Sequence, residues 1–249
     1  MKLSMKLSAP IHKLKSRAKA LRKSESIPLI QALDKIALGE GYASWSLLQS
    51  KTKDHLPACR EEILDYLNLG DLMLLGARPG LGKTTLAIDL MIQAVEEERD
   101  AYLFSLEFTD KDMMKRVERL EDVEASARLN FDFSDEISSD YIIRKTASNL
   151  MSGSLMIIDY LQLLDQRRTN PVLQDQVAAL KSYAEESRCI IIFLSQIDRA
   201  YGGSDIIAPS LEDIRMPNFF DLELFNKILL FNSEKMVFLK PRSFDLNLL

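Results

Sequence analysis

Residues 77–84 read Ala77-Arg78-Pro79-Gly80-Leu81-Gly82-Lys83-Thr84, and this octapeptide is the strongest indication of the fold class. It follows the apolar run Leu72–Leu75 and opens a segment with helical spacing of apolar residues. A Gly-rich turn between a strand and a helix that ends in Lys-Thr is the phosphate-binding P-loop, here with Ala in place of the first Gly. Its glycines let backbone N–H groups turn towards phosphate oxygens, and the helix directs its positive N-terminal end at the same anion.

The P-loop predicts a nucleotide site that takes ATP and Mg²⁺. Lys83 is expected to neutralise the terminal phosphates, and the Thr84 hydroxyl is expected to bind the metal. The residues expected to hold the nucleotide are Arg78, Pro79, Gly80, Leu81, Gly82, Lys83, Thr84 and Thr85.

Strand-like and helix-like segments alternate from residue 72 to residue 239. The strand candidates are continuously apolar, which is typical of parallel strands buried on both faces. We therefore expect an α/β fold with a mostly parallel sheet flanked by helices. The expected strands are Leu72–Leu75, Ala101–Leu106, Leu129–Phe133, Leu155–Asp159, Cys189–Leu194, Ile228–Phe231 and Met236–Leu239. The expected helices are Lys83–Glu96, Asp110–Leu120, Ser139–Leu150 and Leu173–Glu186.

The first 50 residues predict a small bundle of three short helices. Apolar residues recur at helical spacing from Ile11 to Leu21. A second helix is expected to begin at Pro28, a residue suited to the first helical position, and Ser44 is a plausible N-cap of the third. The polar stretch Lys51–His55 is interpreted as a linker.

These patterns divide the chain into a basic helical module, 1–52, and an ATPase domain, 53–249. Residues 1–24 carry +8, and because the whole chain carries −5, the remainder carries −13. Three interpretations of the basic helix stay open: it binds the DNA backbone, it docks on the acidic remainder of the chain, or it is a solvated face.

The composition fits a folded globular chain, with 47% hydrophobic and 28% charged residues. No apolar run approaches the roughly twenty residues of a membrane-spanning helix, so no membrane contact is expected. The two cysteines, Cys59 and Cys189, and the two histidines, His12 and His55, match neither a disulfide framework nor a zinc pattern. We therefore expect no zinc site and a reducing cytoplasm.

Three further strand ends carry polar side chains. Asp159 ends an apolar strand. P-loop enzymes place a carboxylate at the end of such a strand, beside Mg²⁺. The alternative is an Asp that belongs to an ordinary turn. Glu107 closes a strand that we expect next to the P-loop strand, where it can polarise the attacking water; a helix N-terminal acid is the alternative. Gln196 can hydrogen-bond the terminal phosphate, or it can be a polar strand end in solvent.

The four strand ends together resemble the ATPase domain of DnaB-type replicative helicases, which has a RecA-like fold. The resemblance covers about residues 65 to 242 and rests on GARPGLGKTT (76–85), FSLE (104–107), IIDYLQLL (157–164) and LSQIDR (194–199). It implies that Lys83 and Thr84 bind ATP and Mg²⁺ and that Glu107 is the catalytic base. It also implies that Asp159 lies beside the metal and that Gln196 senses the γ-phosphate.

The family also inserts a basic finger into the neighbouring subunit's ATP, and Lys240-Pro241-Arg242 matches the family's Lys-x-Arg. The resemblance makes Lys240 and Arg242 catalytic in trans; a charged strand end in solvent is the alternative. Two loops after strand ends are candidates for DNA contact, and solvated loops are the alternative for both. The candidate DNA residues are Arg167, Arg168, Arg199, Gly202 and Gly203.

By resemblance, the chain is an ATPase, namely a DNA helicase or translocase of the 5′–3′ type in DNA replication. Its partners would be single-stranded DNA and further copies of itself, with a hexamer as the family's ring. No segment resembles the family's primase-interacting domain or its linker helix, which leaves the hexamer open. The competing interpretation is a nucleotide-gated regulatory or helicase-loading ATPase that binds a partner without unwinding. A small-molecule kinase is disfavoured, because Glu107 and Gln196 suit attack by water.

Overall fold

This computed structural model describes residues 7–52, 56–57, 59–118, 123–159, 161, 164, 170–197, 211, 214, 221–231 and 236–239. The chain forms two compact units, Met1–Leu67 and Asn68–Leu249. The division therefore lies after Leu67, whereas the sequence places it after residue 52. None of the helices within the described ranges is long and apolar enough to cross a membrane.

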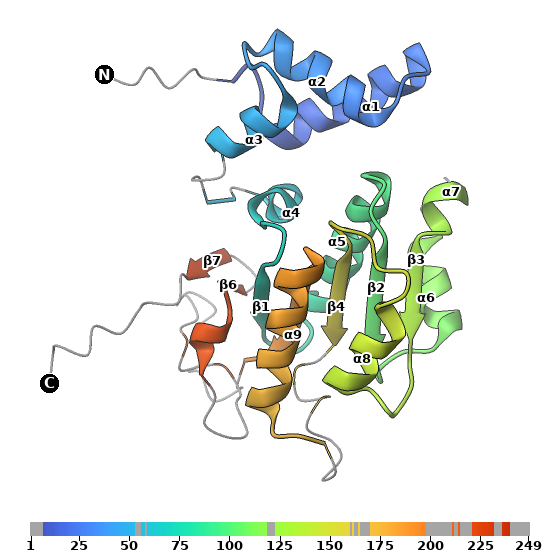
Figure 1. The fold of residues 1–249 in the computed structure, drawn as a ribbon, viewed down its shortest axis with the longest axis vertical. Coiled ribbons are helices and arrows are strands. Elements are labelled where there is room, and N and C mark those ends of the chain that lie inside the picture. Colours follow the sequence, from blue (N-terminus) through green and yellow to red (C-terminus); the bar gives the residue numbers. More distant parts are fainter. Residues whose placement is uncertain are drawn as a thin grey trace, which may run out of the picture. The chain divides into compact units, whose positions relative to one another are not determined.

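The first unit contains the three expected helices, α1 (Ile11–Glu25), α2 (Leu29–Gly39) and α3 (Trp45–Thr52). Figure 1 shows them in blue. The Ser44 hydroxyl accepts a hydrogen bond from the backbone N–H of Leu47, so Ser44 caps α3 as expected. Pro28 differs from the prediction. Its ψ of 146° places it at the cap position before α2 rather than at the first helical residue.

Residues after the expected linker also belong to the first unit. They form a short 3-10 helix, η1 (Arg60–Glu62), and one turn of α-helix, α4 (Ile63–Tyr66). The buried ammonium of Lys15 on α1 pairs with the buried carboxylate of Asp65 on α4. An ion pair between two buried side chains requires both partners, because removing one leaves an uncompensated charge. This pair is a physical reason why the unit extends beyond residue 52.

The second unit is built on a seven-stranded sheet in the order β3-β2-β4-β5-β1-β6-β7. Every neighbouring pair is parallel except β6–β7, which is antiparallel. This arrangement confirms the expected mostly parallel sheet. The strands are β1 (Leu72–Ala77), β2 (Ala101–Ser105), β3 (Leu129–Asp132), β4 (Leu155–Asp159), β5 (Ile190–Gln196), β6 (Lys227–Phe231) and β7 (Met236–Leu239).

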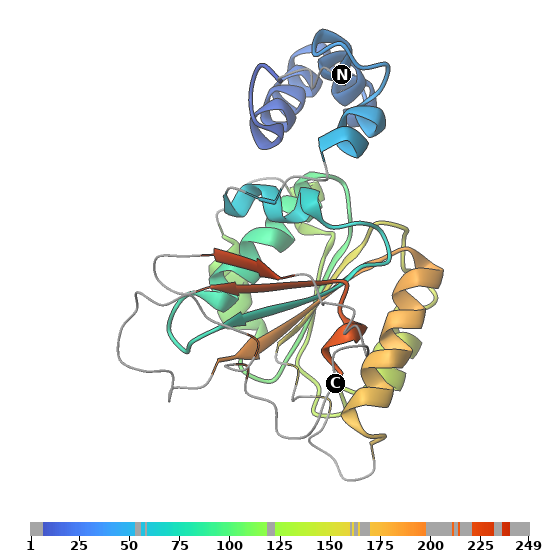
Figure 2. The ribbon, with the colours of Figure 1, turned by 90° about the vertical axis from the view of Figure 1, so that its left-hand side faces the viewer.

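Helices cover both faces of the sheet, as Figures 1 and 2 show. On one face lie α5 (Lys83–Glu96), α6 (Asp110–Val117) and α7 (Val123–Ser126). On the other lie α8 (Ser139–Thr146) and α9 (Leu173–Ser187), and the short η4 (Leu222–Leu224) packs against α9. Helix α8 ends four residues before the expected end.

The core explains why the strands are apolar throughout. All six residues of β1 and all five of β4 are buried. Alternate strand residues pack against the buried side of α9 in one cluster, which includes Leu72, Leu74, Met156, Ile158, Val177 and Leu180. The same two strands also contact α5, which lies on the opposite face of the sheet. A parallel strand between two helical layers needs apolar side chains on both faces.

The strand order corrects one expectation. The strand before Glu107, β2, is not the neighbour of the P-loop strand β1, because β5 and β4 lie between them. Strand β2 pairs instead with β4, in a register that sets Ser105 opposite Asp159. The expectation was wrong because sequence order does not determine which strands pair. Glu107 can therefore approach the site only from beyond the end of β2, next to Asp159.

Candidate nucleotide site

The P-loop connects β1 to α5 through two glycines in left-handed backbone conformations. Gly80 has φ +82° and Gly82 has φ +81°. A Cβ atom on Gly80 would meet no described atom within 4 Å, so the backbone rather than space demands glycine here. Gly82 is the N-cap of α5, and its carbonyl accepts the first helical hydrogen bond from Leu86 N–H at 2.9 Å. The loop therefore ends on a helix N-terminus, a favourable place for phosphate.

The sheet register brings the other expected residues to the same edge. Ala77, the first residue of the motif, lies opposite Gln196, and Gly76 lies opposite Ser195. On its other side, β5 pairs with β4, and there Leu194 of β5 lies opposite Asp159 of β4. All these strands are parallel, so their carboxyl ends gather beside the P-loop, where ligands of open α/β sheets bind.

Lys83 and Asp159 form the centre of the site. The Lys83 Nζ lies 4.0 Å from the Asp159 Oδ1, and the two side chains are 11% and 0% exposed. Neither Asp159 oxygen has a hydrogen bond of normal geometry within the described part of the chain. A buried carboxylate without such bonds is costly, and a cation beside it would compensate the charge.

The protonation of this pair reflects its burial. The pKa of Asp159 is raised to about 6, mainly by burial and also by the charge of Glu107, while Lys83 and the nearby Thr84 hydroxyl oppose the shift. Burial also lowers the pKa of Lys83, against the charges of Asp159 and Glu107. The charge of Glu107 thus acts on both, which indicates that Glu107 lies near the centre despite its distant strand.

Glu107 itself is exposed, just beyond β2. Its backbone N–H donates to the hydroxyl of the buried Ser105, at 3.1 Å. The turn after β2 is thereby held while the carboxylate stays open to solvent. An exposed acid at the rim can reach a water molecule, as a general base must. Helix α6 begins later, at Asp110, after its own N-cap Thr109, so Glu107 does not cap that helix.

Gln196 is half-buried at the end of β5. The residue before it, Ser195, is fully buried, and its hydroxyl has no hydrogen-bond partner among the described residues. Sequence reasoning did not single out Ser195. The sequence feature that could have identified Ser195 is its position one residue before Gln196, at the end of an apolar run. In the sheet register, Ser195 lies opposite Gly76, the residue before the P-loop motif.

The donor set fits a magnesium ion at this site. Thr84 offers a hydroxyl on the first turn of α5, and Asp159 offers a buried carboxylate that lacks normal hydrogen bonds. Hard oxygen ligands of this kind, together with phosphate oxygens, are what Mg²⁺ takes in nucleotide sites. Arg78, Pro79, Gly80 and Leu81 form the loop above it, and the exposed Thr85 follows Thr84.

Seven expected site residues lie outside the described residues. They are the finger candidates Lys240 and Arg242 and the DNA candidates Arg167, Arg168, Arg199, Gly202 and Gly203. Their expected roles stay predictions.

The chain matches a known domain family over most of its length. The family described as "DnaB-like helicase C terminal domain" matches residues 61–142 and 125–218. Replicative DNA helicase DnaB of Helicobacter pylori strain J99 is 30% identical over 181 residues, which span 59% of this chain and 37% of the relative. The corresponding protein of Mycoplasma genitalium strain G37 is 31% identical over 185 residues, with shares of 59% and 39%.

A solved structure of a DnaB-like replicative helicase, described together with its interactions with primase, has a similar fold. The TM-score is 0.54 at 21% identity, over 88% of this chain and 66% of that chain. This likeness supports the fold alone. The chain spans less than two fifths of the length of the two helicases compared by sequence.

Proposed function

Because the chain belongs to the family of DnaB-like helicase C-terminal domains, we propose that it binds ATP with Mg²⁺, hydrolyses it, and uses the energy to move on DNA. In this proposal the chain is the motor part of a replicative helicase. The alternative, a nucleotide-gated module that does not translocate, has no observation in its favour.

The observation that carries the proposal is the convergence of Lys83 and Asp159, 4.0 Å apart at the carboxyl edge of the sheet. Lys83, on the first turn of α5, would neutralise the terminal phosphates. The phosphates would in turn give the largely buried ammonium of Lys83 a negative partner in addition to Asp159. Thr84 and Asp159 would hold Mg²⁺, which when bound neutralises charge on the β- and γ-phosphates.

Glu107 is the proposed general base. Its carboxylate would accept a proton from water as the water oxygen forms a bond to the γ-phosphorus and the bond to the ADP oxygen breaks. Gln196 would hydrogen-bond the γ-phosphate and lose that bond after hydrolysis. The half-buried position of Gln196, beside the start of the P-loop, supports this role.

The remaining parts of the proposal concern partners. Single-stranded DNA would contact Arg167, Arg168 and Arg199. The functional form would be a homo-oligomer, with a hexameric ring as the specific proposal, in which Lys240 and Arg242 act on a neighbour's ATP. The basic helix α1 would offer DNA one cation fewer than its sequence contains, because its Lys15 pairs with Asp65.

The test is ATP hydrolysis by the full chain with and without single-stranded DNA, in wild type and in Lys83→Ala. Lys111→Ala is the matched control, because Lys111 is an exposed lysine on α6. We expect DNA-stimulated hydrolysis in wild type and in the control, and no ATP binding in Lys83→Ala. Unchanged ATP affinity in Lys83→Ala would refute the site. Two other findings together would refute the proposal of a DNA motor, namely ATP hydrolysis without stimulation by DNA and a monomeric state by light scattering. They would favour the nucleotide-gated module that does not translocate.

A further inference from the structure

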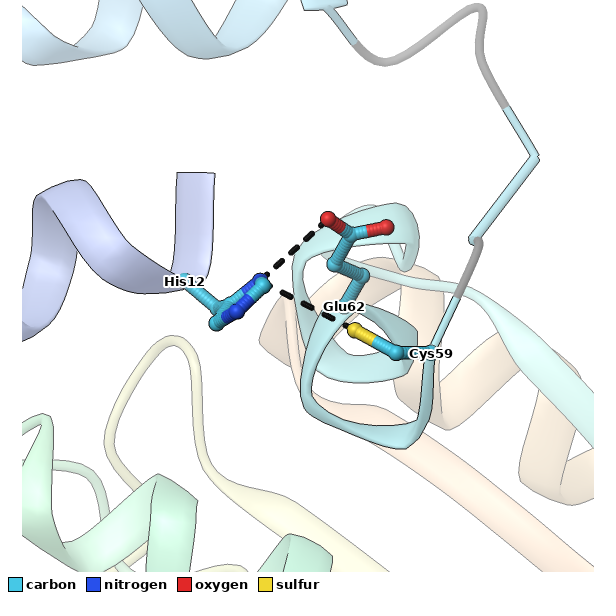
Figure 3. Close-up of side chains that lie close together, drawn as sticks. All are labelled: His12, Cys59 and Glu62. Atoms are coloured by element: carbon cyan, nitrogen blue, oxygen red, sulfur yellow. Dashed lines mark hydrogen bonds and ion pairs between the residues drawn. The ribbon is translucent and has the colours of Figure 1, made fainter. Parts of the chain in front are cut away.

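A second group of ligand-type side chains lies in the first unit, outside the nucleotide site. His12 comes from the first turn of α1, Cys59 immediately precedes η1, and Glu62 ends η1. Figure 3 shows the three side chains pointing toward one another. The His12 Nδ1 lies 3.3 Å from the Glu62 Oε1 and 3.7 Å from the Cys59 Sγ. All three candidate ligand atoms lie within 4.8 Å of one another.

We propose that His12, Cys59 and Glu62 bind a divalent cation of the zinc class, with water at the remaining position. Zinc bonds of about 2.0 Å to nitrogen and oxygen and about 2.3 Å to sulfur, at tetrahedral angles, separate nitrogen from oxygen by about 3.3 Å and from sulfur by about 3.5 Å. The two separations from Nδ1 therefore already match a tetrahedral site closely. A rotation of the Glu62 side chain would bring the third pair into range.

The Cys59 and Glu62 side chains both approach the same ring nitrogen of His12, Nδ1. If Nδ1 carries a proton, it can donate to Glu62 but cannot accept from the thiol. If it carries none, its lone pair faces the carboxylate oxygen. A cation at the centre satisfies all three lone pairs at once.

The chemistry of the three ligands favours zinc over magnesium or calcium. Sulfur and imidazole nitrogen are soft or borderline ligands that suit Zn²⁺, whereas Mg²⁺ and Ca²⁺ prefer oxygen alone. The neighbouring Glu61 also forms a side-chain hydrogen bond with Cys59, which adds a second carboxylate at the edge of the site. The His12 and Glu62 side chains are 25% and 21% exposed, so an ion can enter from solvent.

A cation at this site would link two segments of the first unit that are distant in the sequence. His12 is 47 residues before Cys59 and 50 before Glu62, so one ion would fix α1 to the segment η1–α4. The Lys15–Asp65 ion pair joins the same two segments independently. A cation that binds only the folded unit at 100 times its Kd would raise the folding equilibrium constant of that unit about 100-fold.

The test is zinc binding by the full chain without nucleotide, measured by elemental analysis after dialysis and by competition with a chromogenic chelator. Cys59→Ser, His12→Gln and Glu62→Gln keep approximate size but each remove one ligand. Cys189→Ala and His55→Ala are the matched controls, since they remove the chain's other cysteine and histidine. We expect one tightly held zinc per chain in wild type and both controls, and at least a tenfold weaker affinity in each ligand variant.

Substitution of Co²⁺ for Zn²⁺ provides an absorption signal that appears only if the Cys59 sulfur binds the metal. Co²⁺ in this site should give a near-ultraviolet band from thiolate to metal, which Cys59→Ser loses and Cys189→Ala keeps. Equal far-ultraviolet circular dichroism of zinc-free wild type and Cys59→Ser separates loss of a ligand from loss of the fold. Asp159→Asn must leave the stoichiometry unchanged, because the proposed ion lies outside the nucleotide site. No zinc retention by folded wild type, or equal retention by Cys59→Ser and the controls, would overturn the proposal.

Discussion

Replacing Asp159 by asparagine should stabilise the nucleotide-free protein at neutral pH, although it removes a carboxylate that we assign to Mg²⁺. The folded-state pKa of Asp159 is raised from 3.8 to about 6. Below pH 3.8 the group is protonated in both states and contributes no difference. Between pH 3.8 and 6 the unfolded chain ionises first, so the folded state loses stability as the pH rises. The full loss, reached above pH 6, is about 3 kcal/mol.

The asparagine variant lacks this titration. Lys83 loses its counter-charge in the variant, which offsets part of the gain at every pH at which Lys83 is charged. The cleaner quantity is therefore the pH dependence of the difference between the two proteins. As the pH rises from 4 to 7, the unfolding free energy of Asp159→Asn should increase by about 2 kcal/mol relative to that of wild type. For a domain of this size, that corresponds to roughly 4–8 °C in Tm.

The assay is thermal and urea unfolding of both proteins at several pH values without nucleotide, followed by the same series with ATP and Mg²⁺. Ligand should reverse the order, because it binds wild type and not the variant. Asp132→Asn is the control of opposite sign. Burial opposes ionisation of Asp132, but hydrogen bonds from Lys145, Ser134 and Tyr141 lower its pKa. That variant should lose stability relative to wild type as the pH rises. A difference between Asp159→Asn and wild type that stays flat from pH 4 to 7 would refute the burial argument.

Three further outcomes are expected. Glu107→Gln should lower turnover about 10²–10⁴-fold with ATP still bound, as measured by single-turnover hydrolysis, since it removes a general base; a matching loss of ATP affinity instead would make Glu107 structural. Gly76→Ala should destabilise the second unit by about 1–3 kcal/mol in urea unfolding, because the new Cβ would lie 2.6 Å from the Leu230 Cδ2. An unchanged unfolding midpoint would mean that the Leu230 side chain moves aside at no cost. Arg242→Ala should lower hydrolysis more than ATP affinity, and mixing it with Lys83→Ala should restore part of the ATPase rate; no rescue at any ratio would count against a finger in trans.

The features of the protein that depend on local chemistry could be predicted from the amino-acid sequence. Helix α5 and strand β4 have the expected bounds, Lys83–Glu96 and Leu155–Asp159. The P-loop glycines require left-handed backbone, and strands buried between helices require apolar residues on both faces. These demands act on neighbouring residues, so a single sequence reveals them. The P-loop and the ends of the apolar strands likewise marked the candidate nucleotide site in advance.

The contacts between segments that are distant in the sequence became visible in the three-dimensional structure. It separated β2 from β1 by two strands, and it buried Asp159 fully beside Lys83. It also ended the first unit after Leu67 and brought His12 to Cys59 across 47 residues. Such spacing matches no short metal pattern, so the sequence alone could not suggest the site that we propose there. Strand order and ligand clusters depend on long-range packing, in which many pairings satisfy the same local periodicity and only the whole fold selects among them.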